Sequence, residues 1–316
     1  MNNEEYEFIL LDRIAKIKAI NEQYDLEHNS YIAFSGGKDS VVLSHLIDIA
    51  LPDNKIPRLF SNTGIEFVDM VKYVKDLSIN DKRIIIRNNR LNIKKTLNNE
   101  GYPFKSKEHS QKVYEAINQF KRKGFISEYL TRYKNGIHDY IAKDGTMKKN
   151  LLVCPKILRY QFEKDYTSNI SKFCCDRFKK EPMYQFEKEY NKTIVITGMR
   201  KSEGGNRMKL TCLTHNNTKF HPLLVVSDVW EDEFIKRNNI NLCKLYYPPY
   251  DFNRTGCKGC PYNKNIQKDL ETLYKLLPKE YYQCIHLWKP VYDEYIKIGY
   301  RLKYYPHERS EIENEI

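Results

Sequence analysis

The sequence has no apolar run near the roughly 20 residues that a membrane-spanning helix needs, and Met1 to Glu5 show no basic flank leading into an apolar stretch. These absences predict a soluble, cytoplasmic protein without a membrane partner. Internal repeats, low-complexity tracts and long flexible linkers are absent as well. What is present, 316 residues of which 41% are hydrophobic and 30% charged, suits one large globular domain with an elaboration or two smaller ones.

Positive charge is in excess. The 53 Lys and Arg against 41 Asp and Glu give a formal net charge of +12. Such an excess biases the surface toward polyanions. It does not by itself distinguish a nucleic-acid-binding protein from one with an ordinary lysine-rich surface.

Short apolar runs alternate with helical patterns in the first part of the chain. Strands are expected at 31–34, 57–61 and 82–87, and helices at 5–24, 38–50 and 66–77. The alternation returns with a strand at 193–196, an apolar segment at 220–226, a helix through 229–235 capped by Ser227 or Asp228, and a helical stretch at 266–298. This order predicts an α/β fold with a doubly wound, mostly parallel sheet.

The stretch from Gly101 to Asn150 interrupts this rhythm. It holds eleven Lys or Arg against five Asp or Glu, and eight aromatic residues. Cations that meet phosphates and rings that stack on bases are what a nucleic-acid contact requires, although a helical subdomain with surface lysines has the same composition. We expect the nucleotide domain at 1–100 and 153–262, a basic, aromatic helical insertion at 101–152, and a helical C-terminal region at 263–316.

A glycine turn separates the first expected strand from its helix, in the string Ser35-Gly36-Gly37-Lys38-Asp39-Ser40. Two glycines allow a tight turn close to an anion, and the first amides of the next helix point at it with partial positive charge. Lys38 adds a cation. The string lacks the Walker A spacing, so kinase and GTPase functions lose their main support.

The string resembles the SGGxDS loop of the N-type ATP pyrophosphatase (PP-loop) superfamily, which has an adenine nucleotide alpha hydrolase-like fold. The resemblance implies that ATP binds at 35–40 and is cleaved to AMP and pyrophosphate, with catalytic roles for Lys38 and for Asp39, our candidate for holding Mg²⁺. Thr63 and Gly64 follow the next strand and are expected beside the nucleotide. Glu66 is expected to open the helix after them.

Four of the eight cysteines are grouped, as the pair Cys174-Cys175 and the turn Cys257-Lys258-Gly259-Cys260. A chain without a secretion signal should lie in a reducing compartment, so grouping favours a metal over disulfides. CxxC spacing suits zinc or an iron–sulfur cluster. Neighbouring side chains diverge, which favours two irons of one 4Fe–4S cluster and leaves zinc, or redox-active or structural thiols, as the alternatives.

Further segments resemble the PAPS reductase-like family. Cys174-Cys175 with the later CxxC resembles the cluster-binding cysteines of adenylyl-sulfate reductases, and 254–261 resembles the family's RTGCxxCP segment. The stretch 197–203 with Arg207 resembles its TGxRxxES segment, which implies that Gly198, Arg200 and Arg207 contribute to the nucleotide pocket.

Two departures point away from a sulfonucleotide reductase. The family's C-terminal ECGxH-type nucleophile has no counterpart, because no cysteine follows Cys284, which lies in an expected helix. The loop is also intact, which suits ATP. We therefore expect an ATP-consuming enzyme that adenylylates an acceptor, tRNA or DNA, for sulfur transfer from a donor protein. A reductase and a non-catalytic nucleotide- and cluster-binding module are the alternatives.

Overall fold

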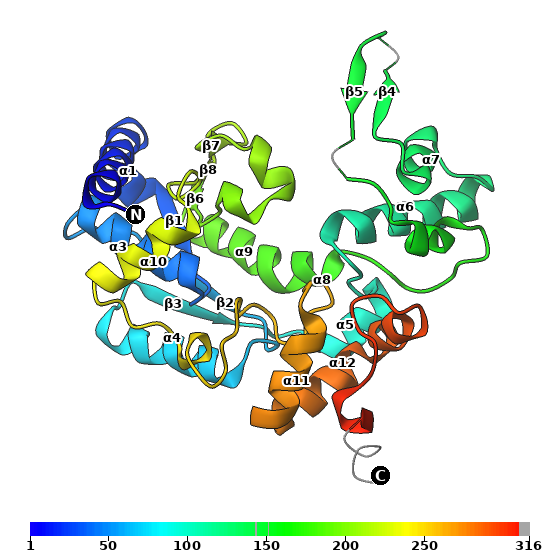
Figure 1. The fold of residues 1–316 in the computed structure, drawn as a ribbon. Coiled ribbons are helices and arrows are strands. Elements are labelled where there is room, and N and C mark those ends of the chain that lie inside the picture. Colours follow the sequence, from blue (N-terminus) through cyan, green and yellow to red (C-terminus); the bar gives the residue numbers. More distant parts are fainter. Residues whose placement is uncertain (143, 151, 310–316) are drawn as a thin grey trace. The chain divides into compact units, whose positions relative to one another are not determined.

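The computed structural model describes residues 1–142, 144–150 and 152–309 (Figure 1). Lys143, Leu151 and the last residues of the expected C-terminal region, 310–316, lie outside the described residues. The chain divides into two compact units. The first unit comprises Met1–Arg90 and Phe178–Cys257, and the second comprises Leu91–Arg177 and Lys258–Ile316.

The first unit contains the large sheet. Its strands are β1 (Ser30–Ala33), β2 (Arg58–Asn62), β3 (Ile84–Asn88), β6 (Ile194–Ile196), β7 (Leu213–Thr214) and β8 (Lys219–Phe220). Its helices are α1 (Asn3–Tyr24), α2 (Leu26–Asn29), α3 (Lys38–Ala50), α4 (Val68–Asn80), α9 (Glu181–Glu189) and α10 (Asp228–Arg237), with short 3-10 helices at Lys201–Glu203, Gly205–Lys209 and Lys244–Tyr246.

The strand order is β3-β2-β1-β6-β8-β7, and every neighbouring pair is parallel except β7 with β8. The expected mostly parallel α/β sheet is confirmed. The chain runs outward from β1 to β3 and then returns to the other side of β1 with β6. The carboxyl ends of β1 and β6 are therefore the switch point at which such sheets bind ligands.

Both faces of this sheet are buried, and successive residues along each strand point to opposite faces. Tyr31, Leu59 and Val195 pack with Phe186 of α9 on one face. Their neighbours in sequence, among them Ile32, Phe60 and Ile196, point to the opposite face and are buried as well. Near-continuous apolar strands are what a sheet covered on both sides requires.

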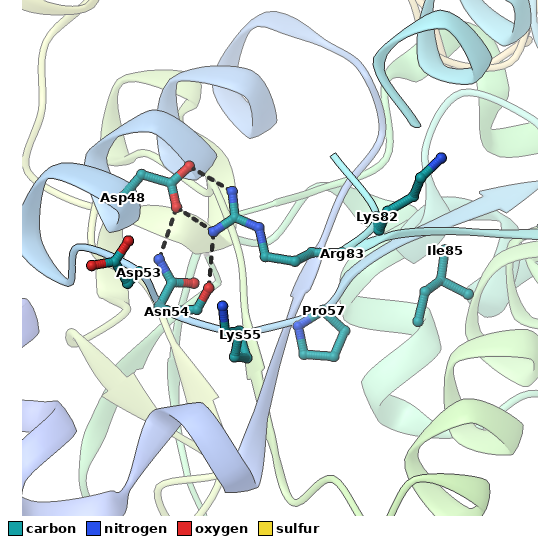
Figure 2. Close-up of a pocket in the computed structure, with 8 residues that line it drawn as sticks. All are labelled: Asp48, Asp53, Asn54, Lys55, Pro57, Lys82, Arg83 and Ile85. Carbon is teal, nitrogen blue, oxygen red and sulfur yellow. Dashed lines mark hydrogen bonds and ion pairs between the residues drawn. The ribbon is translucent and has the colours of Figure 1, made fainter. Parts of the chain in front are cut away.

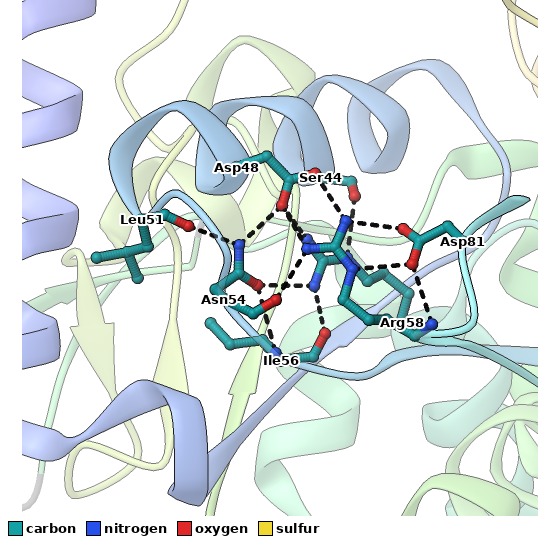
Figure 3. Close-up of polar contacts among 8 residues, drawn as sticks. Ser44, Asp48, Leu51, Asn54, Ile56, Arg58 and Asp81 are labelled. Carbon is teal, nitrogen blue, oxygen red and sulfur yellow. Dashed lines mark hydrogen bonds and ion pairs between the residues drawn. The ribbon is translucent and has the colours of Figure 1, made fainter.

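A network of charged side chains fixes the amino ends of β2 and β3 (Figure 3). Arg58 is fully buried; it donates to Asp48 at 2.6 Å, to Asn54 at 2.9 Å and to Ser44 at 3.2 Å. Arg83 donates to the same Asp48 at 2.7 Å and to Asp81 at 2.8 Å. Beside the network lies a cavity of 640 Å³, lined by Lys55, Lys82 and six other residues (Figure 2).

The second unit is mainly helical. It contains α5 (Ile93–Glu100), α6 (Lys107–Lys123), α7 (Glu128–Asn135), α8 (Phe173–Cys175), α11 (Ile266–Leu276) and α12 (Pro278–Lys297), with a 3-10 helix at Lys156–Phe162. Its antiparallel hairpin joins β4 (Asp139–Ile141) to β5 (Met147–Lys149). A π-helix, Asp176–Lys180, spans the division between the units. No helix among the described residues combines the length and apolarity needed to cross a membrane.

Three expected elements differ from the observed ones. The helix expected from Glu66 begins at Val68, because Glu66 accepts hydrogen bonds from Thr63 and forms a β-bridge with Cys257. The helical stretch at 266–298 breaks between Leu276 and Pro278, where proline begins α12 and lacks an amide hydrogen. The apolar segment at 220–226 contributes only Phe220 to a strand.

Candidate nucleotide site at the carboxyl ends of the strands

The glycine loop lies between β1 and α3, as the sequence predicts. Gly36 has φ +71°, and a Cβ there would lie 2.6 Å from Met70 Sδ and from Val74 Cγ2 of α4. Any larger residue at position 36 would therefore meet both an unfavourable backbone conformation and occupied space. The two requirements explain why glycine stands at this turn.

Hydroxyl groups hold the loop in shape. Ser40 Oγ donates to Gly37 O at 2.8 Å and accepts from Ser35 N at 3.1 Å. The Lys38 amide, at the start of α3, donates to the Tyr246 hydroxyl at 3.0 Å, and Tyr246 bonds to Thr255 Oγ1 at 2.7 Å. The Tyr246 phenol oxygen thus accepts a hydrogen bond from an amide that we predicted to face phosphate.

The loop after β2 approaches the same edge. Thr63 is buried and donates through its amide and its hydroxyl to Glu66, each at 2.8 Å from Oε2. Its hydroxyl also lies 3.9 Å from Cys257 Sγ. Gly64 has φ +81°. The structure therefore brings the expected Thr63-Gly64 turn next to the end of the RTGC segment.

The loop after β6 completes this edge. A Cβ on Gly198 would lie 2.9 Å from the backbone oxygen of Asp39, so glycine permits the loop to approach the first turn of α3. Arg200 follows and is 5% exposed. Its guanidinium lies 2.6 Å from Asp39, 2.5 Å from Asp228 and 3.1 Å from Glu231. Three carboxylates from two helices therefore surround the arginine that we expected to clamp phosphate.

Lys38 points to the same helix, α10. Its Nζ lies 3.0 Å from Glu231 Oε2 and 3.0 Å from Asp232 Oδ1. Burial lowers the pKa of Lys38, but the two carboxylates outweigh burial and raise it, so the ammonium stays charged. Burial and the charge of Asp39 raise the pKa of Glu231 to about 7, against the opposing effects of Arg200 and Lys38.

Arg207 lies close enough to Asp39 to interact with its charge. Its guanidinium is 3.0 Å from Glu203, which also accepts a hydrogen bond from Arg254. Burial lowers the pKa of Arg207, and Asp39 acts in the opposite direction. Glu203 thereby links the expected phosphate-binding arginine to the RTGC segment.

The cysteines expected to hold metal are divided by the unit boundary. Cys174, Cys175 and Cys260 belong to the second unit, and Cys257 is the last residue of the first. Within the second unit, burial and the charges of these three thiols raise the pKa of Tyr262. The described residues contain no group of three or more His, Cys, Asp or Glu side chains arranged to hold a metal ion.

The CxxC turn is packed against α12 in the second unit. Gly259 has φ +61°, and a Cβ there would lie 2.6 Å from the Tyr292 hydroxyl and 2.8 Å from Cys284. The expected tight turn at Gly259 is confirmed. Burial raises the pKa of Cys284 to about 12, so its thiol stays protonated at neutral pH.

Sequence reasoning missed the acidic residues of α10. Of the two expected caps, Ser227 is the observed one and accepts from the Trp230 amide at 3.2 Å, whereas Asp228 pairs with Arg200 and Glu231 with Lys38 and Arg200. A signal existed, because Glu231 lies between Trp230 and Phe234 on the buried stripe of this helix. Tyr246 was missed too, because it ends a three-residue 3-10 helix that is too short to show a periodic pattern.

This chain shows low sequence similarity to a protein of known sequence and to several solved structures. An uncharacterised protein of Methanocaldococcus jannaschii is 24% identical over 95% of this chain, which spans about 60% of that protein's length. Among solved structures, a phosphoadenylyl-sulfate reductase of Candida auris is 15% identical, with 78% of this chain and 91% of that one covered and a TM-score of 0.39.

Two more solved structures are similar at this level. An NH3-dependent NAD synthetase of Campylobacter jejuni is 15% identical, with coverages of 92% of this chain and 94% of that one and a TM-score of 0.40. A U34-tRNA thiolase of Methanococcus maripaludis, solved with its [4Fe-4S] cluster, is 13% identical, with coverages of 90% and 79% and a TM-score of 0.31.

The family match covers most of the chain and includes the segments described above. Residues 29–139 and 125–263 match the phosphoadenosine phosphosulfate reductase domain. These ranges include the glycine loop, the Thr63-Gly64 turn, the Gly198–Arg200 loop and both cysteine motifs. The chain therefore belongs to the phosphoadenosine phosphosulfate reductase family.

Proposed function

We propose that this protein binds ATP at the glycine loop and cleaves it to AMP and pyrophosphate, adenylylating a nucleic-acid acceptor for sulfur transfer. The observation that carries this proposal is the convergence of four segments at the carboxyl ends of neighbouring parallel strands. The 35–40 loop, the Thr63-Gly64 turn, the Gly198–Arg200 loop and Thr255 are joined there by the contacts given above. Such an edge is where open parallel sheets bind ligands.

The chemistry follows from the charges at this edge. An acceptor oxygen attacks the α-phosphorus, a new P–O bond forms, and the bond to the β-phosphate breaks with its electrons on pyrophosphate. Lys38 is positioned to stabilise the charge that grows on the leaving group. Asp39 is assigned to the Mg²⁺ that accompanies ATP. A sulfur nucleophile from the donor protein then displaces AMP.

Side-chain exposure in the insertion supports a nucleic-acid acceptor. Tyr102, Phe104 and Tyr133 are buried, so only part of the aromatic content is available for contacts. The last turn of α6 presents exposed Lys121, Arg122 and Lys123, followed by Phe125, which is 63% exposed. Exposed cations next to an exposed ring suit phosphates and unstacked bases.

The proposed 4Fe–4S cluster rests on the residue types and the CxxC spacing of the cysteine motifs. Three thiols of the second unit lie around the Tyr262 phenol closely enough to raise its pKa, and the fourth stands in the same CxxC turn as Cys260. Cys174, Cys175, Cys257 and Cys260 would hold the cluster, and four thiolates occupy one position on each iron. The cluster would then supply structure and negative charge.

Pyrophosphate release tests the reaction. The full chain is purified without oxygen, its iron, sulfide and zinc are measured, and pyrophosphate is followed with Mg-ATP and tRNA, DNA or adenylyl sulfate. We expect iron and sulfide near four each per chain, and release that depends on tRNA or DNA. Zinc without iron would overturn the cluster assignment.

Two further outcomes separate the alternatives. Sulfite released from adenylyl sulfate or its 3′-phosphate with thioredoxin and without ATP would establish a reductase instead. The protonated, buried state of Cys284 argues against this outcome, because a thiolate is the required nucleophile. Salt-sensitive nucleic-acid binding without pyrophosphate release from any acceptor would identify a non-catalytic module.

A further inference from the structure

Glu231 of α10 is a fully buried carboxylate that faces two cations. Its Oε2 atom lies 3.0 Å from Lys38 Nζ and 3.1 Å from the Arg200 guanidinium. Its side chain is 0% exposed, and among the described residues neither oxygen has a hydrogen bond of good geometry. Two ion pairs are therefore what holds this charge inside the protein.

A carboxylate in this state is costly to maintain. Transfer of an ionised carboxylate out of water costs several kcal/mol, and native structures normally offset that cost with hydrogen bonds on the buried oxygens. Arg58 shows that the same unit satisfies a buried charge when the role is structural, because its guanidinium bonds to Asp48, Asn54 and Ser44. An under-satisfied buried charge next to a ligand edge points instead to a functional role.

The two cations come from different parts of the chain. Lys38 begins α3 after β1, and Arg200 follows β6, the parallel neighbour of β1. Two positive side chains brought together at one edge repel each other. Glu231 belongs to neither loop, so the carboxylate can fix both at once from a third element. The other charged groups facing this cluster are Asp39 of α3 and Asp228 and Asp232 of α10.

We propose that Glu231 is a positioning residue that holds Lys38 and Arg200 side by side to receive neighbouring phosphates of the nucleotide. This inference rests on the proposed function and deepens it. A carboxylate in this place has two opposite effects. It aligns the cations with the leaving pyrophosphate, and its own charge repels the phosphates in the ground state.

The two effects separate in Glu231→Gln, which keeps the shape of the side chain and removes its charge. For the full chain with Mg-ATP at pH 8, where Glu231 with its pKa of about 7 is mostly ionised, we expect the dissociation constant to fall on the order of tenfold as repulsion is lost. We expect kcat for pyrophosphate release to fall on the order of tenfold or more as alignment is lost. Calorimetric titration gives the first value and a coupled pyrophosphate assay the second.

Glu233→Gln is the matched control. Glu233 lies on the same helix and pairs with Arg237 at 2.7 Å, away from the loop. The control should leave both constants within twofold of the parent values. Glu231→Asp retains the charge and should bind Mg-ATP like the parent chain, with a kcat between those of the parent and of Glu231→Gln.

Several results would overturn the inference. Unchanged constants in Glu231→Gln would do so, and so would weaker binding accompanied by a lower melting temperature, which a merely structural residue would give. If the parent chain releases no pyrophosphate with any acceptor, the proposed reaction fails, and inorganic pyrophosphate then serves as the probe. Tighter pyrophosphate binding by Glu231→Gln would still support the positioning role, and unchanged binding would reject it.

Discussion

The two ends of the sheet in the first unit both carry buried charges, yet they satisfy them differently. At the amino ends of β2 and β3, Arg58 and Arg83 share Asp48 in a network whose members also bond to Asn54 and Asp81 (Figure 3). At the carboxyl ends, Glu231 lies against Lys38 and Arg200 with no well-formed hydrogen bond among the described residues.

The difference separates stability from function. A saturated network favours one folded arrangement and has little left to offer a ligand. A buried charge that lacks such a network and lies at a ligand edge is instead a candidate for a functional role. The cavity at the amino ends is large, but it lies at the end of the sheet opposite the switch point, so its size does not make it the nucleotide site.

The largest expected effect is on stability, at the amino ends. Arg58→Met removes a fully buried cation, leaves its buried partner Asn54 without this donor and leaves the partly exposed Asp48 with one partner fewer. We expect the free energy of unfolding to fall by about 3 to 5 kcal/mol, measured by urea denaturation. Mg-ATP affinity of the remaining folded protein should not change. A loss below about 1 kcal/mol would show that this network is not the stabilising one.

At the carboxyl ends the comparison predicts the reverse, a loss of activity that exceeds the loss of stability caused by removing one partner of Glu231. Lys38→Ala should lower the rate of pyrophosphate release by about a hundredfold to a thousandfold, because one preorganised cation is removed from the leaving group. Lys55→Ala, on the rim of the amino-end cavity, is the matched control and should retain full activity. Equal losses in the two variants would erase the distinction between the two ends.

A buried histidine at the carboxyl ends should make the stability of the fold sensitive to acid. His221 is buried between Thr197 and Thr214, and burial, with Lys219 and His215, lowers its pKa to about 4. The unfolded state, with a histidine pKa near 6.5, binds more protons below that pH. Stability is therefore lost as pH falls from about 6.5 toward 4, by up to roughly 1.4 kcal/mol per pH unit.

At the amino ends, burial lowers the pKa of His45 as well, so this histidine adds to the loss in the same direction. Asp81 of the amino-end network should not contribute over that range. Burial raises the pKa of Asp81, but its hydrogen bonds from Arg83 outweigh burial and lower it, so its contribution is lost only below about pH 4. His221→Gln retains a donor and an acceptor for the two threonines. Its melting temperature should fall less than that of the parent between pH 7 and 5. An identical pH dependence would place the titrating group elsewhere.

The smallest expected effect concerns the helix that carries Glu231. Ser227→Ala removes the cap that accepts from Trp230 N and should cost about 1 kcal/mol in the free energy of unfolding. Ser106→Ala removes the corresponding cap of α6 in the second unit, and its cost in the free energy of unfolding is the value for comparison. A far larger cost at Ser227 would show that the cap also supports the charged cluster.

Periodicity was enough to predict much of the fold. The expected strands lie within one or two residues of β1, β2, β3 and β6, because buried parallel strands are short, apolar and bounded by turns. Side-chain contacts between distant residues were not predictable in this way. Glu66 carries no periodic signal that reveals its bonds to Thr63, so α4 was expected to start too early.

The candidate site was predictable where short-range geometry demands a residue type. Gly36 and Gly198 stand where the surrounding atoms leave no room for a side chain. A glycine required in this way belongs to a short motif that can be recognised in the sequence. Glu231 and Tyr246 contact Lys38 across more than 190 positions of sequence, and only the folded chain brings them together. The sequence therefore revealed the loop but not its neighbours.

Gly198 lies so close to the backbone of Asp39 that no side chain fits between them. A methyl group there would push the loop after β6 off the first turn of α3, whatever ligand the protein binds. Gly198, two residues before Arg200, is thus required by excluded volume rather than by reactivity. In homologues that have exchanged one substrate for another, this glycine should survive after the reactive side chains around it have changed.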